Sequence, residues 1–255
     1  MTRSLSGEVA VVTGGSSGIG RAIGLTFAEH GADVVVADLQ PEPREGGDPT
    51  HERIESETDA DARYVHCDVR EIDDLEAAVE AAEAYGGVTV MVNNAGLTRV
   101  ESLLDVTEAD YRRIMDVNAK GTFFGSQIAA RRMVDRGRGA IINMSSDAGL
   151  QGTNNSAVYG MSKGAVRMLT YSLAVQLGPE GVRANAIHPG PVRTALQSQD
   201  LEGMYDLEAH GKTVPAGRVA TPEDVANAAL FLADPASEFV NGESLIVDGG
   251  AFRKP

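Results

Sequence analysis

Cysteine and long apolar runs are both scarce in this 255-residue chain, and each scarcity excludes a class of protein. The single cysteine, Cys67, cannot form a disulfide within the chain, so we expect a reducing compartment, the cytoplasm. No run of about 18 apolar residues occurs, so we expect no membrane span. The polar start, residues 1–8, leaves no room for a secretory signal before the first apolar run.

Positive charge is also scarce, because 37 acidic residues face 22 basic ones and the formal net charge is −15. Nucleic acid is therefore disfavoured as a partner, since no basic face is available. An acidic chain with so few lysines favours a halophilic protein, because concentrated salt screens the repulsion between surface carboxylates. An acidic protein of an ordinary habitat is the alternative. The lysines are Lys120, Lys163, Lys212 and Lys254.

Short apolar runs alternate with segments of helical periodicity. Runs such as Val9–Val12 and Ala140–Met144 are typical of strands that are buried on both faces. This alternation predicts an α/β fold, a single Rossmann-like, doubly wound parallel sheet of about seven strands with helices on both faces. We expect one domain over residues 1–255, with the polar, irregular stretch 197–213 as a lid near the site.

One predicted helix contains residues that do not suit a helix. It begins after Thr107, whose hydroxyl is placed to cap the first turn, and it runs on to Arg132. Asn118 and Gly121 are poor helix formers in its middle. We therefore expect a local kink or a bound water at that point.

A glycine-rich turn, residues 13–20, follows the first predicted strand and opens a helix. Gly14 and Gly18 let the backbone approach a pyrophosphate, and the helix N-terminus offers free N–H groups. Asp38 ends the next strand, where a carboxylate can accept both ribose hydroxyls of an adenosine and repel a 2′-phosphate. The pattern favours NAD over NADP, although Arg44 could reach a 2′-phosphate. A turn without a ligand and a purely capping Asp38 are the alternatives.

A phenol and an ammonium lie four residues apart at Tyr159 and Lys163, on one face of a predicted helix. A nearby positive charge lowers the pKa of a phenol, which suits a group that exchanges protons near neutral pH. Ser146 follows a strongly apolar strand, where its hydroxyl can hold a substrate oxygen. An ordinary exposed pair with a capping serine is the alternative.

Together these motifs resemble the short-chain dehydrogenase/reductase family over nearly the whole chain. The motifs are the glycine-rich turn, Asp68, Asn93-Asn94-Ala95-Gly96, Asn118, Ser146, Tyr159-x-x-x-Lys163 and Pro189-Gly190. The resemblance implies that Tyr159 is the catalytic acid/base and that Ser146 polarises the substrate oxygen. It also implies that Lys163 binds the nicotinamide ribose and lowers the pKa of Tyr159, and that Asn118 holds a water of a proton relay. The implied cofactor residues are Gly14, Ser16, Ser17, Gly18, Ile19, Asp38, Asp68, Val69, Asn94, Ala95, Gly96, Tyr159, Lys163, Pro189, Gly190, Val192 and Thr194.

The implied activity is hydride transfer between NAD(H) and a secondary alcohol or ketone, in a homotetramer. Gln151, Asn154 and Asn155 favour a sugar or polyol, although these side chains could instead bond their own loop. An NADP-dependent reductase of 3-oxoacyl thioesters is the alternative enzyme. A nucleotide-sensing binding protein on the same fold is the alternative outside enzymes. The five histidines are scattered, so we expect no metal site.

Overall fold

A single parallel sheet of seven strands forms the centre of the computed structural model, which describes residues 4–194, 209 and 211–253. The strand order is β3-β2-β1-β4-β5-β6-β7, and every neighbouring pair is parallel. The predicted Rossmann-like sheet is therefore confirmed. The strands are β1 Val9–Thr13, β2 Asp33–Asp38, β3 Ala62–His66, β4 Val90–Asn93, β5 Gly139–Met144, β6 Val182–Pro189 and β7 Ser244–Val247.

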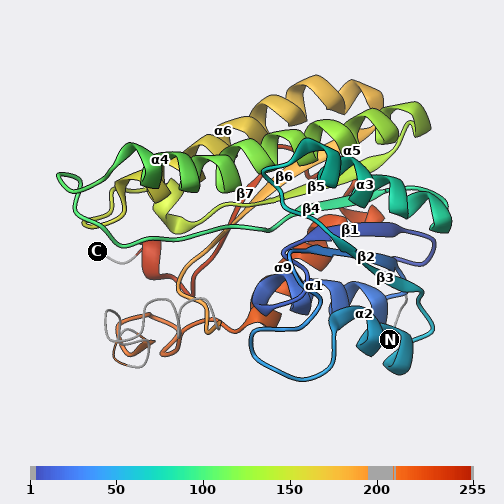
Figure 1. Ribbon diagram of the computed structural model, residues 1–255, viewed down its shortest axis with the longest axis horizontal. Helices are drawn as coiled ribbons and strands as arrows, with labels where there is room; N and C mark the ends of the chain where they lie inside the picture. Colours follow the sequence, from blue (N-terminus) through green and yellow to red (C-terminus); the bar gives the residue numbers. More distant parts are fainter. Residues whose placement is uncertain (1–3, 195–208, 210, 254–255) are drawn as a thin grey trace.

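Helices cover both faces of this sheet (Figure 1). One layer contains α1, α2 and α9, and the opposite layer contains α3, α4, α5 and α6. The bounds are α1 Gly18–Glu29, α2 Thr50–Glu57, α3 Ile72–Ala81, α4 Glu108–Met115, α5 Thr122–Arg136, α6 Ala157–Leu177 and α9 Pro222–Ala233.

The strand sequences explain this sandwich, because successive side chains point to opposite faces of a sheet. In β1, Val9 and Val11 pack in the core under α3 and α5, whereas Ala10 and Val12 pack in the core under α1 and α9. All four are buried, so a continuous apolar run is what a strand at this position needs.

The predicted helix from Thr107 to Arg132 is wrong as a single α-helix. Thr107 caps α4 as expected, because its hydroxyl accepts a hydrogen bond from Asp110 N. A π-helical stretch, Asp116–Gly121, then separates α4 from α5. The predicted irregularity thus falls at Asn118 and Gly121, where a wide turn of backbone replaces the expected kink.

β3 ends at His66 and leaves Asp68 in the turn that follows it. The predicted lid, 197–213, lies outside the described residues except at 209 and 211–213. Within the described ranges, no helix is both long and apolar enough to cross a membrane.

Cys67 lies just beyond β3 and is 3% exposed. Burial raises the pKa of its thiol to about 12, and the nearby carboxylates of Asp74, Asp68 and Asp38 add to the shift. Such a thiol is a packing residue rather than a nucleophile.

Candidate active site

The predicted site residues gather at the carboxyl edge of the sheet. The glycine-rich turn follows β1, Asp38 ends β2, Asn94 follows β4 and Ser146 follows β5. The order of the strands changes direction between β1 and β4. From β1 the chain adds β2 and β3 on one side, and from β4 it adds β5, β6 and β7 on the other side. Ligands of open α/β sheets bind at this kind of switch point.

The glycine-rich turn has the backbone that a dinucleotide needs. Gly14 and Gly18 have φ values of +65° and +55°, a region that favours glycine. A Cβ placed on Gly20 would lie 2.1 Å from the carbonyl oxygen of Gly14, so the turn packs tightly on its own helix. Ser16 Oγ is buried and has no hydrogen-bond partner within the described part of the chain. An unpaired buried hydroxyl in this turn fits a polar ligand such as a dinucleotide.

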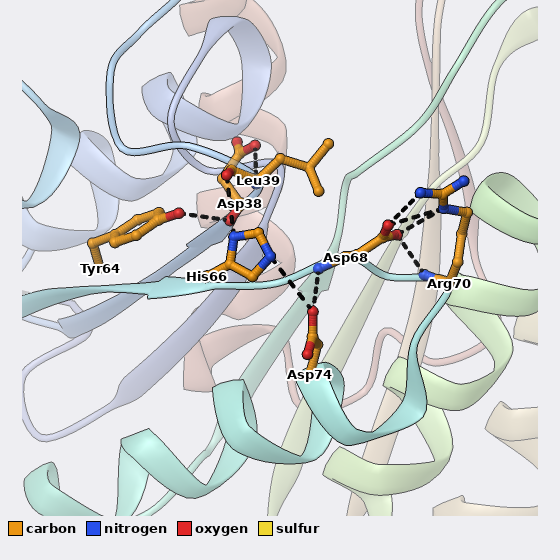
Figure 2. Close-up of polar contacts among 7 residues, drawn as sticks. All are labelled: Asp38, Leu39, Tyr64, His66, Asp68, Arg70 and Asp74. Carbon is orange, nitrogen blue, oxygen red and sulfur yellow. Dashed lines mark hydrogen bonds and ion pairs between the residues drawn. The ribbon is translucent and has the colours of Figure 1, made fainter.

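Asp38 lies beside the same turn and, at the end of β2, close to Tyr64 and His66 (Figure 2). Its Oδ2 accepts a hydrogen bond from Ser16 N at 2.9 Å, and its Oδ1 accepts one from Leu39 N at 2.7 Å. Burial raises the pKa of this carboxyl, and the backbone N–H bonds oppose the rise. Asp38 therefore caps the turn, as the alternative reading held, at a position that is also suited to a ribose.

Asp68 is paired more completely than the sequence suggested. Its carboxylate accepts hydrogen bonds from Arg70 Nε at 2.9 and 3.0 Å, and Asp68 N donates to Asp74 Oδ2 at 2.9 Å (Figure 2). The bond from Arg70 lowers the pKa of the Asp68 carboxyl. His66 links Asp74 to the end of β2. Its Nε2 lies 3.8 Å from Asp74 Oδ2, and its Nδ1 forms a hydrogen bond with Leu39 O at 3.1 Å.

Asn94 and Ala95 lock β4 to the end of β1, as expected of small and amide residues at a strand end. Asn94 Nδ2 donates to Thr13 O at 2.9 Å and to Gly14 O at 3.2 Å. Asn94 N and Ala95 N both donate to Thr13 Oγ1, at 3.0 and 3.1 Å. These contacts hold the floor of the predicted cofactor site rigidly against the glycine-rich turn.

A buried polar network behind β4 and β5 had no signal in the sequence. Asn93 Nδ2 donates to Ser126 Oγ at 2.9 Å and to Asn143 Oδ1 at 2.8 Å. Asn143 Nδ2 in turn donates to Thr170 Oγ1 at 3.0 Å. The network ties two strands to α5 and α6, so the helix that carries Tyr159 is fixed relative to the sheet.

Ser146 and Tyr159 are brought together. Ser146 lies within hydrogen-bond reach of the Tyr159 phenol, and this contact lowers the pKa of the phenol. The neighbouring Ser145 Oγ instead donates to Lys163 O at 2.8 Å and faces the helix backbone. Ser146 Oγ also donates to Asp147 Oδ1 at 2.9 Å, and the sequence analysis had not considered Asp147.

The pKa of Tyr159 was expected to be lowered, but in this structure it is raised. Burial raises the pKa of the phenol, the bond from Ser146 lowers it, and the negative charge of Asp147 raises it. Lys163 Nζ lies 5.8 Å from the centroid of the Tyr159 ring and donates instead to Met144 O at 2.8 Å. Four-residue spacing places the two residues on one face of α6, but it does not decide where the ammonium points.

Lys163 is almost fully buried, with 4% of its surface exposed. Burial lowers the pKa of its ammonium to about 8. A Cβ placed on Gly96 would lie 3.3 Å from Lys163 Nζ, so the segment after β4 passes close to this charge. The structure therefore brings Gly96 and Lys163 together, as the resemblance implied.

Asn118 is completely buried in the π-helical stretch. Its Oδ1 accepts from Leu97 N at 2.8 Å, and its Nδ2 donates to Leu97 O at 2.9 Å and to Ser162 Oγ at 3.0 Å. The side chain therefore ties the segment after β4 to α6. Its role in holding a relay water stays a prediction.

The segment after β6 returns to the glycine-rich turn. A Cβ placed on Gly18 would lie 3.4 Å from Thr194 Cγ2, and Val192 is buried and bridged to Ala220. Gly190 N donates to Val247 O at 3.0 Å, which fixes the start of this segment to β7.

Two further residues of the predicted cofactor site make packing contacts. Ile19, on α1, packs against the hydrophobic core. The side chain of Val69 lies close to Gly121 of the π-helical stretch.

His188 is a buried histidine next to Ser146 that sequence reasoning missed. Its Nδ1 bonds Ser146 O and its Nε2 bonds Ser244 Oγ, both at 2.9 Å. The carbonyl can only accept, so Nδ1 carries the proton and Nε2 accepts from Ser244. Burial lowers the pKa of His188, which keeps this neutral tautomer in place.

A hollow lies between the loop that follows Ser146 and the first turn of α6, and its lining includes Ala148 and Gly160. Gln151 and Thr153 supply polar lining, and Leu150 and Met161 supply apolar lining. Asn155, which was expected near the substrate, instead bonds Glu101 N at 2.6 Å through its backbone carbonyl. Among the described residues no cluster of three or more histidine, cysteine or carboxylate side chains could hold a metal ion.

The chain matches known proteins over almost its whole length. A family model described as enoyl-(acyl carrier protein) reductase matches residues 14–251. The chain is 39% identical over 251 residues to a 3-alpha-(or 20-beta)-hydroxysteroid dehydrogenase of Mycobacterium bovis, covering 98% of this chain and 91% of that one. It is 37% identical over 259 residues to an NADP-dependent (R)-specific alcohol dehydrogenase of Lentilactobacillus kefiri, covering 98% of each chain.

A solved structure agrees with these sequence matches. The crystal structure of a short-chain type dehydrogenase/reductase from Mycobacterium marinum superimposes with a TM-score of 0.88 at 34% identity, covering 98% of this chain and 97% of that one. The motifs, the sheet order and these matches agree along the whole chain, which thus belongs to the short-chain dehydrogenase/reductase family of NAD(P)-dependent oxidoreductases.

Proposed function

We propose that this protein oxidises a secondary alcohol, or reduces the corresponding ketone, with Ser146, Tyr159, Lys163 and Asn118 as its catalytic group. The pairing of Ser146 with the Tyr159 phenol, next to the buried ammonium of Lys163, carries the proposal. Two hydroxyls that face one space can hold a single substrate oxygen. The relatives, a hydroxysteroid dehydrogenase and an alcohol dehydrogenase, act on secondary alcohols by their names.

Each of these four residues has its own role in the proposed reaction. Ser146 Oγ donates a hydrogen bond to the substrate oxygen, and Tyr159 takes the alcohol proton or returns it to a ketone. Lys163 holds the cofactor ribose through its ammonium, which lies beside Gly96. Asn118 positions Leu97 and Ser162 around this group and, we propose, holds the relay water. A bound nicotinamide ring supplies the hydride acceptor or donor.

We propose NAD as the preferred cofactor, although one relative is named as NADP-dependent. Asp38 is the supporting observation, because its carboxylate lies at the turn where the adenosine ribose is expected and would repel a 2′-phosphate. The cofactor would lie along Gly14, Ser16, Gly18, Asn94 and Gly96. The unpaired Ser16 Oγ and the close packing of Gly96 on Lys163 fit this path.

The substrate side of the proposal is a small polar molecule such as a polyol or sugar. Gln151 and Thr153 line the hollow between α6 and the loop that follows Ser146, and they support it. A 3-oxoacyl thioester is the second candidate, because the matching family model is described as enoyl-(acyl carrier protein) reductase, a description that also names an acyl substrate. A panel of polyols, simple secondary alcohols, steroids and acyl thioesters, each assayed with NAD and NADP, decides between these classes.

The Tyr159→Phe variant tests the catalytic assignment directly. Because the change removes only the phenolic oxygen, kcat should fall by about 10²–10⁴-fold while NADH binding changes little. Steady-state rates and a fluorescence titration with NADH measure the two effects. The assignment fails if the variant keeps more than about a tenth of the wild-type kcat.

We also propose a homotetramer located in the cytoplasm. Met161, Met168 and Val175 recur every seven residues on α6 and are 47%, 57% and 78% exposed. Two helical turns separate each from the next, so all three lie on one outward face of the helix. A face of this kind supports the packing of α6 against a second copy, with the region of β7 as the other contact.

A further inference from the structure

The loop between β2 and α2, residues 39–49, contacts the glycine-rich turn at two points. Glu45 Oε1 accepts a hydrogen bond from Gly18 N at 2.9 Å. Arg44 N donates to Ser17 Oγ at 2.8 Å. The loop is polar and has no helical or strand periodicity, so nothing in the sequence indicated that its acid would reach this turn.

Glu45 supplies a negative charge that α1 otherwise lacks. Gly18 is the first residue of the 12-residue helix α1, whose first turn contains no acidic residue. Ser17, at the N-cap position, makes no capping hydrogen bond with its side chain. A helix N-terminus carries unpaired N–H groups and a partial positive charge, so an approaching carboxylate is stabilised there.

The same N–H group belongs to the position where a pyrophosphate is expected to bind. Ser16 Oγ, which is 1% exposed and unpaired among the described residues, is a second polar group of the turn that awaits a partner. Ser16 N is held by Asp38, a residue suited to the ribose, whereas Gly18 N is held by Glu45. Each of two carboxylates, those of Asp38 and Glu45, therefore accepts a hydrogen bond from a different N–H group of the turn.

We propose that Glu45 is an internal competitor of the cofactor pyrophosphate, which sets the affinity of the enzyme for its dinucleotide. The inference rests on the proposed cofactor role of this turn. A dinucleotide that binds must displace the carboxylate from Gly18 N, and the free energy of that contact is subtracted from the free energy of binding. The displaced carboxylate also remains near the pyrophosphate, where the like charges repel each other.

The Glu45→Gln variant removes the charge and keeps the shape of the side chain. The contribution of a carboxylate at an exposed helix N-terminus corresponds to a dissociation constant for NAD that is about two- to fivefold lower in the variant. Glu42→Gln is the matched control, because it removes the same charge from the same loop without touching Gly18. Calorimetric titration of each protein with NAD and with NADH measures the constants.

A melting experiment provides a readout that is independent of activity. Without cofactor, Glu45→Gln should melt below the wild type, because α1 has lost its carboxylate. With saturating NAD this difference should vanish or reverse, because the contact is displaced in both proteins and only the wild type keeps a carboxylate near the pyrophosphate. A wild type that still melts above the variant with saturating NAD would overturn the inference.

Three outcomes of the titration with NAD decide whether Glu45 competes with the cofactor, and they separate this inference from the proposed function. Tighter NAD binding by Glu45→Gln and Glu45→Ala, but not by Glu42→Gln, supports the competition. Saturable binding to all four proteins with equal constants, or weaker binding by the Glu45 variants, overturns the inference alone. No saturable binding of either dinucleotide to any of them overturns the proposed function and the inference together.

Discussion

Burial is the main cause of the raised pKa of Tyr159, and the carboxylate of Asp147 adds to it. The carboxylate accepts a hydrogen bond from Ser146 Oγ, and its charge raises the pKa of the phenol because a second negative charge nearby is disfavoured. Alcohol oxidation needs the phenolate, so its kcat/KM should rise with pH. Ketone reduction needs the protonated phenol and should be favoured at lower pH.

The Asp147→Asn variant should move the rising limb of alcohol oxidation to lower pH. Removing the negative charge removes one cause of the raised pKa, so the phenolate forms earlier along the pH scale. A pH profile of kcat/KM checks the shift, with Asp135→Asn, an exposed acid at the end of α5, as the control. A limb that stays at the wild-type pH would show that Asp147 does not act on the phenol.

Residue-level geometry was the part of the site that the sequence predicted least completely. The family resemblance singled out Ser146, whereas the neighbouring Ser145 turns to the backbone of α6. The direction of the Tyr159 pKa was missed, since it depends on burial and on the contact of Lys163 with Met144. Glu45 was missed because an acid in an irregular loop has no periodic signal to mark its contacts.

At the scale of elements, the π-helical stretch 116–121 connects α6, the helix that carries Tyr159, to the segment after β4. Asn118 bonds both backbone groups of Leu97 and the hydroxyl of Ser162 on α6. An Asn118→Ala variant leaves these polar groups without partners, which should cost about 1–3 kcal/mol of unfolding free energy.

Urea unfolding checks that loss, and Asn154→Ala, which removes an exposed amide from the loop before α6, is the control. NADH binding should weaken in the Asn118 variant, because the segment that includes Gly96 loses its tie. Equal unfolding midpoints for the two variants would contradict the structural role of Asn118.

The elements themselves were largely predictable. Continuous apolar runs indicated buried strands because both faces of the sheet are covered, and the capping Thr107 marked the start of α4. In the sequence, the only sign of the π-helical stretch was the pair of poor helix formers Asn118 and Gly121. Its geometry depends on the tertiary contacts of Asn118 and on the close approach of Gly121 to Val69, which local preferences do not encode.

At the scale of the whole molecule, we expect the net charge to make stability depend on salt. With a net charge of −15, folding brings carboxylates together, and only nearby cations or dissolved salt can offset the repulsion. The Debye length falls from about 10 Å at 0.1 M salt to about 3 Å at 1 M salt. We therefore expect the melting temperature to rise between ~0.1 M and ~2 M KCl, and an unchanged value would mean that the acidic surface is incidental.

The outward face of α6 is the second whole-molecule feature with a testable consequence. A charge placed in a buried subunit contact is costly, so Met168→Glu should dissociate the proposed tetramer into smaller species. Ala77→Glu adds the same charge to the exposed side of α3 and serves as the control. Sedimentation in ~2 M KCl measures the masses, and a Met168→Glu protein as large as the wild type would exclude this face as an interface.

The buried thiol of Cys67 makes the chain convenient for labelling chemistry. With a pKa of about 12, its thiolate population at neutral pH is on the order of a thousandfold below that of an ordinary cysteine. A maleimide dye would therefore find almost no reactive sulfur on the native protein. A cysteine introduced in the loop 39–49 would be the one fast-reacting position, and its fluorescence would report the displacement of that loop in real time.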